Sequence, residues 1–505
     1  MKSYKKTTTY IYVLMFISAV LLFSCTEFPE PDAEIHVDVS QIHHTISGGM
    51  GASWHAISKD FPLNNEKYKY PSREDSSRGS AWGGNPPVTD TSAWNQIQQF
   101  ASWLGMNFLR VELSQRMYEP EQGIFDWENE EMQALYLILD WCQQNDADVF
   151  LQQMWGYVEW NSFPGVHPLI SAPRDLNEFA NGIATMLEYL IQDKGYTCIK
   201  YFCMTNEPPG GTWGYWWEYG DEKGTINDAW EKLKEVFEER GINVLISGPD
   251  WTDMPPFNEE KLTFSPYLGS IDIHSYRGVN DRGEINLKNW ADWSHTNEKP
   301  FFLTEYGNMR LGWGGNNPAQ KSFEAALSNA NDVIRAFRSG VDGVNRWSFI
   351  NRSDLDGQWQ LIKTFDPEKQ EYLKIIEIEN EAFYGFGIIS RFLSKYSSVV
   401  ECSVSCPDSV LMSLALLSPG GELSIFILNP SDNDLCIGLE MTAFSPKQMN
   451  VYQVTKETVL QPGFELNAIR KFKSAKKTQL TLPAKSITTV SSYLLKNSDK
   501  GIIMQ

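Results

Sequence analysis

The sequence predicts an α/β protein, a (β/α)8 TIM barrel with an additional antiparallel β-sandwich domain. Two observations support this fold class. Over residues 45–350, short apolar runs alternate with longer segments of helical period, which indicates repeated strand–helix units around a parallel sheet. After residue 385 the chain changes to β-rich runs separated by turns, a texture typical of an antiparallel sandwich. We therefore assign residues 45–385 to the barrel and 386–497 to the sandwich, with a tail at 498–505.

The N-terminus has the pattern of an export signal. Three lysines precede an apolar stretch at residues 10–23, which is typical of a secretory signal and too short for a membrane span. Residues 22–25 resemble a bacterial lipoprotein signal that would make Cys25 the lipidated first residue, and the acidic residues that follow resemble the export tag of Bacteroidota-type surface lipoproteins. We expect 1–25 to be a lipoprotein signal peptide and the protein to be exported and lipid-anchored to the outer membrane, facing outward. An ordinary signal peptide, with a periplasmic or secreted protein, is the alternative.

The elements follow in order along the chain. Residues 26–44 form a tether whose alternating segment 35–39 could add an edge strand to the sandwich and make the two domains one rigid unit. Amphipathic helices, such as those around 132–142 and 323–337, separate the predicted barrel strands. These eight strands are 46–51, 107–113, 148–155, 199–205, 244–248, 271–276, 300–305 and 344–349. The carboxyl ends of such strands form the active face of a barrel, so the residues there are the candidates for chemistry.

Composition excludes several classes of function. A formal net charge of -21 gives no basic footprint for a nucleic acid. The six cysteines after residue 25 show no metal-ligand spacing, and no His-Glu-x-x-His motif is present, so we expect no metal and no cofactor. Cys402 and Cys406 are the nearest pair for a disulfide, and isolated buried thiols are equally consistent with the sequence. Oligomeric state is not readable from the chain.

Two glutamates end predicted strands. Glu207 lies in Thr205-Asn206-Glu207-Pro208 after an apolar run, and Glu305 ends the run 300–305. Two carboxyl groups about 5 Å apart on a rigid rim are what retaining glycoside hydrolysis requires, one as proton donor and one as nucleophile. Asn206 is placed to bind a sugar hydroxyl, and the following proline keeps Glu207 out of helical geometry. The alternative is a loop or N-cap acid at Glu207 and a salt-bridge partner at Glu305.

With these residues in place, the barrel resembles clan A of the retaining glycoside hydrolases. The resemblance implies that Glu207, on strand four, is the acid/base and that Glu305, on strand seven, is the nucleophile. It also implies supporting roles on three other strands: a strand-two arginine that holds the nucleophile charged, a strand-six pair whose tyrosine donates to the nucleophile, and a strand-eight platform beneath the cleaved sugar. These residues are Arg110, then His274 and Tyr276, then Trp347. Read without the resemblance, Arg110 could instead be a rim ion-pair residue, and His274 and Tyr276 could be structural.

Within the clan, the chain looks most like family 30 and related families with a C-terminal β-sandwich. The segments that carry this likeness are 37–41, 46–53 and 482–486. The departures are Gly49-Met50, where Gly-Phe is more usual, and an insert at 59–87 without a clear counterpart. Because the nucleophile must be ionised to attack, we expect Arg110 and Tyr276 to lower the pKa of Glu305.

Tryptophans that follow strand ends could stack on the apolar face of a pyranose, although plain packing is equally consistent. The candidates are Trp155, Trp213 and Trp251. The expected function is a retaining β-glycoside hydrolase that cleaves a polysaccharide or oligosaccharide by double displacement. The alternative is a non-catalytic surface glycan-binding protein on a degenerate barrel, which would be expected to lack at least one of the two carboxylates.

Overall fold

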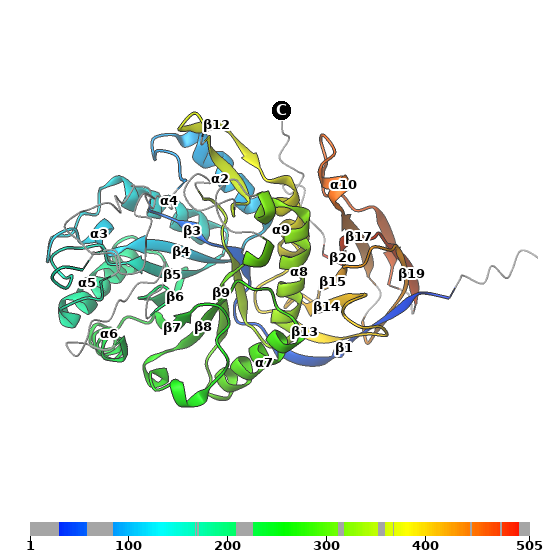
Figure 1. Cartoon of the computed structure of the whole chain (residues 1–505), viewed down its shortest axis with the longest axis horizontal. Coiled ribbons are helices and arrows are strands. Elements are labelled where there is room, and N and C mark those ends of the chain that lie inside the picture. The colour runs from blue at the N-terminus through cyan, green and yellow to red at the C-terminus, as the bar shows by residue number, and fades with distance from the viewer. Residues whose placement is uncertain are drawn as a thin grey trace, which may run out of the picture.

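The computed structural model describes residues 30–57, 84–166, 168, 171–208, 226–311, 318–351, 359–366, 368–444, 447–474 and 477–493. Figure 1 shows a barrel of strands with helices around it, joined through α8 and α9 to a second β-domain. The expected signal peptide with Cys25, the tail at 498–505 and Trp213 lie outside the described residues. Among the helices that are described, none has both the length and the apolar character needed to cross a membrane.

The barrel is a closed parallel sheet whose strand order is β2-β10-β9-β8-β7-β6-β5-β4-β3. The two short strands β2 and β3 flank Ser53 in one continuous segment; β2 pairs with β10 and β3 pairs with β4, so together they fill the first of eight strand positions. This confirms the eight predicted strands. Their bounds are β2 Met50–Ala52, β3 Trp54–His55, β4 Phe108–Ser114, β5 Asp148–Trp155, β6 Ile199–Cys203, β7 Leu245–Trp251, β8 Ser270–Ser275, β9 Phe301–Tyr306 and β10 Gly343–Arg346.

Helices cover the outside of the barrel except after β7. Residues 252–269 contain two short 3-10 turns and no α-helix, because three prolines interrupt this segment, at 255, 256 and 266. One of the eight expected strand–helix repeats is therefore incomplete. The helices are α2 Thr91–Leu104, α3 Gln115–Tyr118, α4 Glu130–Gln144, α5 Leu176–Glu188, α6 Ile226–Arg240, α7 Asp281–Thr296, α8 Phe323–Arg338 and α9 Asn380–Ser390.

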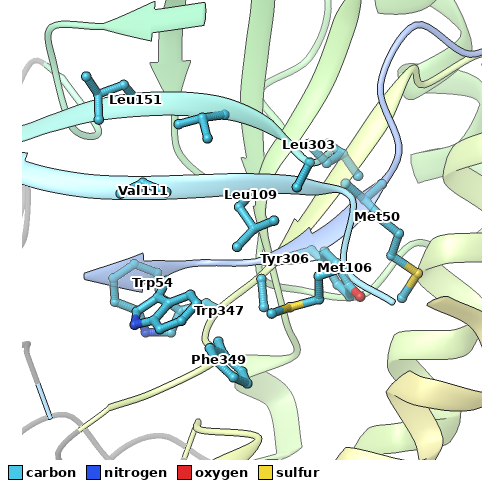
Figure 2. Close-up of a cluster of buried hydrophobic side chains, with 14 of the residues drawn as sticks. Met50, Trp54, Met106, Leu109, Val111, Leu151, Leu303, Tyr306, Trp347 and Phe349 are labelled. Carbon is cyan, nitrogen blue, oxygen red and sulfur yellow. The ribbon is translucent and has the colours of Figure 1, made fainter. Parts of the chain in front are cut away.

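Alternation along the strands separates the barrel interior from the helix layer. On β4, Leu109, Val111 and Leu113 belong to the large apolar core that includes the helices, and Figure 2 shows the first two beside Leu151 of β5. The alternate residues of β4 point into the barrel. Phe108 joins a closed cluster there with Phe150, Tyr201, Cys203 and Phe302, while Arg110 and Glu112 lie nearer the carboxyl ends. The interior thus has an apolar layer below and a buried polar layer above it.

The second domain is a single curled sheet, in which strand β1 Ala33–Thr45 lies between β13 and β16. All neighbouring strands are antiparallel except β1 and β16. The two ends of the sheet meet, because Gln453 Nε2 of β17 donates to Thr481 O of β19 at 2.7 Å. An apolar cluster fills the curl. The segment expected at an edge is therefore an interior strand. The order is β18-β17-β20-β15-β14-β13-β1-β16-β19, with bounds β13 Ser398–Val404, β14 Met412–Leu417, β15 Leu423–Asn429, β16 Leu435–Thr442, β17 Gln448–Val454, β18 Arg470–Lys473, β19 Thr478–Leu482 and β20 Ser486–Ser491.

Helix α9 joins the two domains and spans the boundary expected between residues 385 and 386. On the barrel side, Phe383 stacks on Trp103 of α2 with ring centroids 4.7 Å apart. On the other side, Thr489 Oγ1 of β20 donates to Ile388 O at 2.6 Å. One continuous apolar core includes residues of both domains. A hairpin of β11 Ile362–Asp366 and β12 Glu371–Ile378 lies between β10 and α9 in the chain.

Candidate active site

Glu207 and Glu305 meet at the carboxyl ends of the barrel strands. Each offers a carboxylate oxygen, and these two atoms and a ring nitrogen of His274 all lie within 4.8 Å of one another. The side chain of Glu207 is 14% exposed and that of Glu305 is 4% exposed. A separation of about 5–5.5 Å is typical of retaining glycosidases, whereas inverting enzymes need about 6.5–9.5 Å. The pair is therefore close enough for a nucleophile and an acid acting on one sugar carbon.

A β-bulge turns Glu305 toward the barrel interior. The partner of Ile273 in β8 is Leu303, but the partner of the next residue is already Glu305, so β9 holds one extra residue there. The register between β9 and β10 also shifts at this point. Bulges re-aim side chains, and without this one the alternation along β9 would direct Glu305 to the opposite face from Phe302.

Arg110 and Tyr276 hold the carboxylate of Glu305. Nη1 of Arg110 donates to Oε1 of Glu305, and the Tyr276 hydroxyl donates to Oε2. Nη2 of Arg110 donates to Oδ1 of Asn206 at 2.9 Å, so one guanidinium orients the nucleophile candidate and the residue before Glu207. Nη1 of Arg110 also donates to Glu112, which contacts His55. Arg110 is thus an interior residue shared between two carboxylates.

Burial raises the pKa of Glu305 to about 7, although Arg110 and His274 both act in the opposite direction. Arg110 thus lowers the pKa of Glu305 as expected, but the net shift is upward. The reason is desolvation, which disfavours the charged carboxylate and which a strand-end sequence cannot reveal. The positive charge of Arg110 is also shared between Glu305 and Glu112, because its Nη1 donates to both. At Glu112, where burial again opposes ionisation, His55 and Arg110 hold the pKa below its usual range.

His274 lies between the carboxylates. Its Nδ1 is 2.9 Å from Oε1 of Glu207 and 3.2 Å from Oε2 of Glu305, and its Nε2 is 2.9 Å from Oδ1 of Asp250. Burial opposes charge on the ring, but Glu305 and Asp250 raise the pKa of His274 well above its ordinary value. Both ring nitrogens therefore face side-chain carboxyl groups.

The tryptophan candidates have different places. The Trp347 ring lies 5.9 Å from the Arg110 guanidinium carbon and meets the His55 ring edge-on at 5.0 Å, so it adjoins the polar cluster. Trp155 ends β5, and its side chain is not among the described parts. The structure does not bring Trp251 to the carboxylates. Its ring packs against Phe264 and Trp290 in the outer layer, with centroids 5.4 and 6.3 Å away.

Three buried polar residues near the glutamates were not singled out from the sequence. Asp250 lies on β7, and the strand-end criterion that found Glu305 could have found it. Glu112 is two residues after Arg110 in β4. Because side chains alternate along a strand, the sequence could have placed it on the same face as Arg110. Gln152 of β5 donates to Asp250 Oδ2 at 3.2 Å, and nothing in its sequence context distinguishes it.

Two groups of side chains have the spacing of metal ligands. One is Glu207 with His274 and Glu305, and the other is Cys203 with Asp250 and Asp272. In the first group, Arg110 and Tyr276 already donate to Glu305, and His274 faces carboxylates through both nitrogens. A histidine that binds a metal ion must be neutral and must direct a ring-nitrogen lone pair at the ion. The first group, Glu207 with His274 and Glu305, therefore suits an acid–base pair better than a metal ion.

Solved structures with a similar fold include several glycoside hydrolases and an exported protein. A glycoside hydrolase family 30 subfamily 8 xylanase from Clostridium acetobutylicum matches with TM-score 0.61 and 14% identity, over 91% of this chain and 99% of that chain. A conserved exported protein from Bacteroides fragilis matches with TM-score 0.62 and 13% identity, over 91% and 100%. An endo-beta1,6-glucanase matches with TM-score 0.60 and 13% identity, over 91% and 94%. At these identities the likeness is one of fold.

No curated protein matches the sequence. The clan A barrel with a side β-domain that the sequence predicts is confirmed by these structures, several of which belong to family 30. The family description that matches the sequence itself is Cellulase (glycosyl hydrolase family 5), over residues 64–339, which is more than half of the chain. The chain therefore belongs to the cellulase family, glycosyl hydrolase family 5.

Proposed function

We propose that this chain is a retaining β-glycoside hydrolase that cleaves a polysaccharide or oligosaccharide by double displacement. The observation that carries the proposal is the approach of Glu207 and Glu305 to within 4.8 Å, on strand ends of a glycoside hydrolase barrel. This separation leaves room for one anomeric carbon and no separate water, which is the geometry of retention.

In the first step, the carboxylate of Glu305 attacks the anomeric carbon while Glu207 gives its proton to the glycosidic oxygen. A covalent glycosyl ester on Glu305 forms, and the aglycone leaves. In the second step, Glu207 takes a proton from water, the water oxygen attacks the same carbon, and Glu305 departs as a carboxylate. Arg110 and Tyr276 support this by donating to the carboxylate of Glu305 before attack and after release.

The substrate side of the proposal rests on family and fold. Family membership supports a carbohydrate substrate. The similar structures include xylanases and an endo-beta1,6-glucanase, which supports a β-linked glycan. Trp347, beside Arg110, is our candidate for the platform under the cleaved sugar. Asn206, whose amide Arg110 orients, is our candidate for a contact to the neighbouring hydroxyl.

The test is digestion of a panel of aryl glycosides and plant, fungal and host glycans, with product sizing and NMR of the newly released anomer. A β-linked substrate is expected to release a β-anomer first, and product lengths report internal or terminal cleavage. Release of the α-anomer first would exclude double displacement. Binding of a glycan without any cleavage across the panel would instead favour the non-catalytic glycan-binding protein.

We also propose that the protein is exported and anchored to the outer membrane through a lipid on Cys25, facing outward. The sequence of residues 1–25 and the acidic residues after it support this. Labelling with palmitate, and accumulation of the unprocessed form under globomycin, are expected for the native chain. A Cys25→Ala protein that stays membrane-bound would contradict the proposal, and its release to the periplasm or medium would support it.

A further inference from the structure

Asp250 is placed in the barrel by a bulge of its own. Opposite β8, Pro249 pairs with Asp272 and Trp251 pairs with the very next residue, so Asp250 is the extra residue of β7. Its φ of 58° lies in the left-handed region, which is strained for a non-glycine residue. The side chain is fully buried. A strained, buried carboxylate is retained in a fold only where the surroundings compensate it.

The contacts of Asp250 reach both parts of the acid–base machinery. Oδ1 accepts from Nε2 of His274 at 2.9 Å, and Oδ2 accepts from the backbone N–H of Glu207 at 3.1 Å. Glu207 has a φ of 45°, also in the left-handed region. Asp250 therefore holds the ring that touches both glutamates, and it holds the unusual backbone conformation from which Glu207 projects. Gln152 Nε2 donates to Oδ2 at 3.2 Å and completes this set.

A second carboxylate, Asp272, lies behind Asp250. Asp272 accepts from Ser247 Oγ at 2.7 Å and from Thr304 Oγ1 at 3.0 Å, and it is hydrogen-bonded to Asp250. Two buried carboxylates in contact cannot both be ionised, so the pair holds one proton. Burial and the charge of Asp250 raise the pKa of Asp272 well above its usual range, so the proton resides on Asp272. Burial opposes ionisation of Asp250 as well, but His274 and Arg110 hold its pKa below the usual range.

We propose that Asp250 is a positioning residue of this site, which keeps His274 as an imidazolium between Glu207 and Glu305 and fixes the backbone of Glu207, with protonated Asp272 as its support. The positive ring stabilises the negative charge that Glu305 needs for attack and the charge that Glu207 acquires when it gives up its proton. The groups that face His274 are Asp250 from β7, Glu207 after β6 and Glu305 from β9. The groups farther from His274 are Asp272 on the same strand β8, Tyr276 directly after that strand, and Arg110, which binds the far side of Glu305.

The ionisation of His274 can be observed without turnover. In the full-length protein labelled with 15N-histidine, the signal lost in His274→Gln is assigned to His274. Because carboxylates raise the pKa of this ring, we expect it to stay doubly protonated at pH values where a free histidine is neutral. In Asp250→Asn, loss of the carboxylate charge is expected to lower the pKa of the ring, so that it loses its proton at a lower pH than in the native protein. A neutral His274 at pH 7 in the native protein would overturn the proposal, whatever the variants do.

Asp272→Asn is the matched variant, because an amide is neutral like a protonated acid and offers both a donor to Asp250 and an acceptor oxygen. It is expected to retain the imidazolium signal of His274 and to lose only a few-fold in activity. If Asp272→Asn abolishes that signal and Asp250→Asn leaves it intact, the two assignments are reversed and the proposal fails. Circular dichroism and thermal melting of both variants separate loss of fold from loss of ionisation.

The activity readout rests on the proposed glycosidase function. With a cleaved substrate, Asp250→Asn is expected to lower kcat about 100-fold while KM changes less than about threefold, because the acid–base groups and not the binding surface are disturbed. An unchanged kcat, or a loss confined to KM, would contradict a positioning role. If no substrate is cleaved at all, the function fails, but the NMR result still decides the state of His274.

Discussion

The guanidinium of Arg110 is shared between Glu305 and Glu112, to which its Nη1 donates inside the barrel. All three side chains are almost completely buried. One cation thus faces two anions where water cannot screen them, and burial still raises the pKa of Glu305 to about 7. The catalytic pair of the proposed mechanism is therefore under opposing electrostatic demands, and four predictions follow from them.

The first concerns the two glutamates. Glu207→Gln and Glu305→Gln remove the proton donor and the nucleophile, so each is expected to lower kcat by about 100- to 10,000-fold on glycosides with poor leaving groups. Initial rates, with folding checked by circular dichroism, measure this. Glu238→Gln is the matched control, because Glu238 is 70% exposed on the outer helix α6 and is expected to keep full activity. Full activity in either of the first two variants would refute their assignment.

The second concerns the pH profile of kcat/KM, which reports ionisation in the free enzyme. Only ionised Glu305 can attack, and its pKa is raised to about 7. We therefore expect kcat/KM to fall about tenfold per unit as pH decreases below that value. A profile that stays flat down to pH 5 would show that Arg110 and His274 outweigh burial at Glu305.

The third uses stability instead of activity. The folded pKa of Glu305 exceeds its unfolded value of 4.5, so the folded state binds more protons between pH 4.5 and about 7. The free energy of unfolding contributed by this group therefore decreases as pH rises through that window. Glu305→Gln removes the contribution, so its Tm relative to the native protein is expected to increase from pH 4.5 to pH 8. A relative Tm that instead decreases over this range would mean a lowered pKa at Glu305.

The fourth tests the sharing of Arg110. The negative charge of Glu112 contributes to the raised pKa of Glu305 and competes for the same guanidinium. Glu112→Gln is therefore expected to lower the pKa of Glu305 and move the acidic limb of kcat/KM to lower pH. The pH profile of the variant beside that of the native protein measures the shift. A limb that moves to higher pH would show that Glu112 supports Glu305 chiefly by holding Arg110 in place.

Several features of the site were predictable because their signals are local. Each barrel strand is a short apolar run, and the period of two along β4 places Arg110 and Glu112 on one face. Glu207, Glu305, His274 and Tyr276 stand at strand ends, which all meet at one face of a parallel barrel. These positions needed no knowledge of distant parts of the chain. By the same criterion Trp251 was chosen, but its ring packs into the outer layer.

Other features depend on how distant segments meet. The bulges that turn Asp250 and Glu305 inward exist only relative to their partner strands, and β1 became an interior strand because residues more than 350 positions later pair with it on both sides. The raised pKa of Glu305 depends on burial by the whole barrel, which no local pattern contains. The sequence by itself determined which glutamates are the candidates for the chemistry and which strands bear them, since those signals are short-range. Only the tertiary structure decided their orientation, register and charge state, since these arise from pairing and desolvation across the fold.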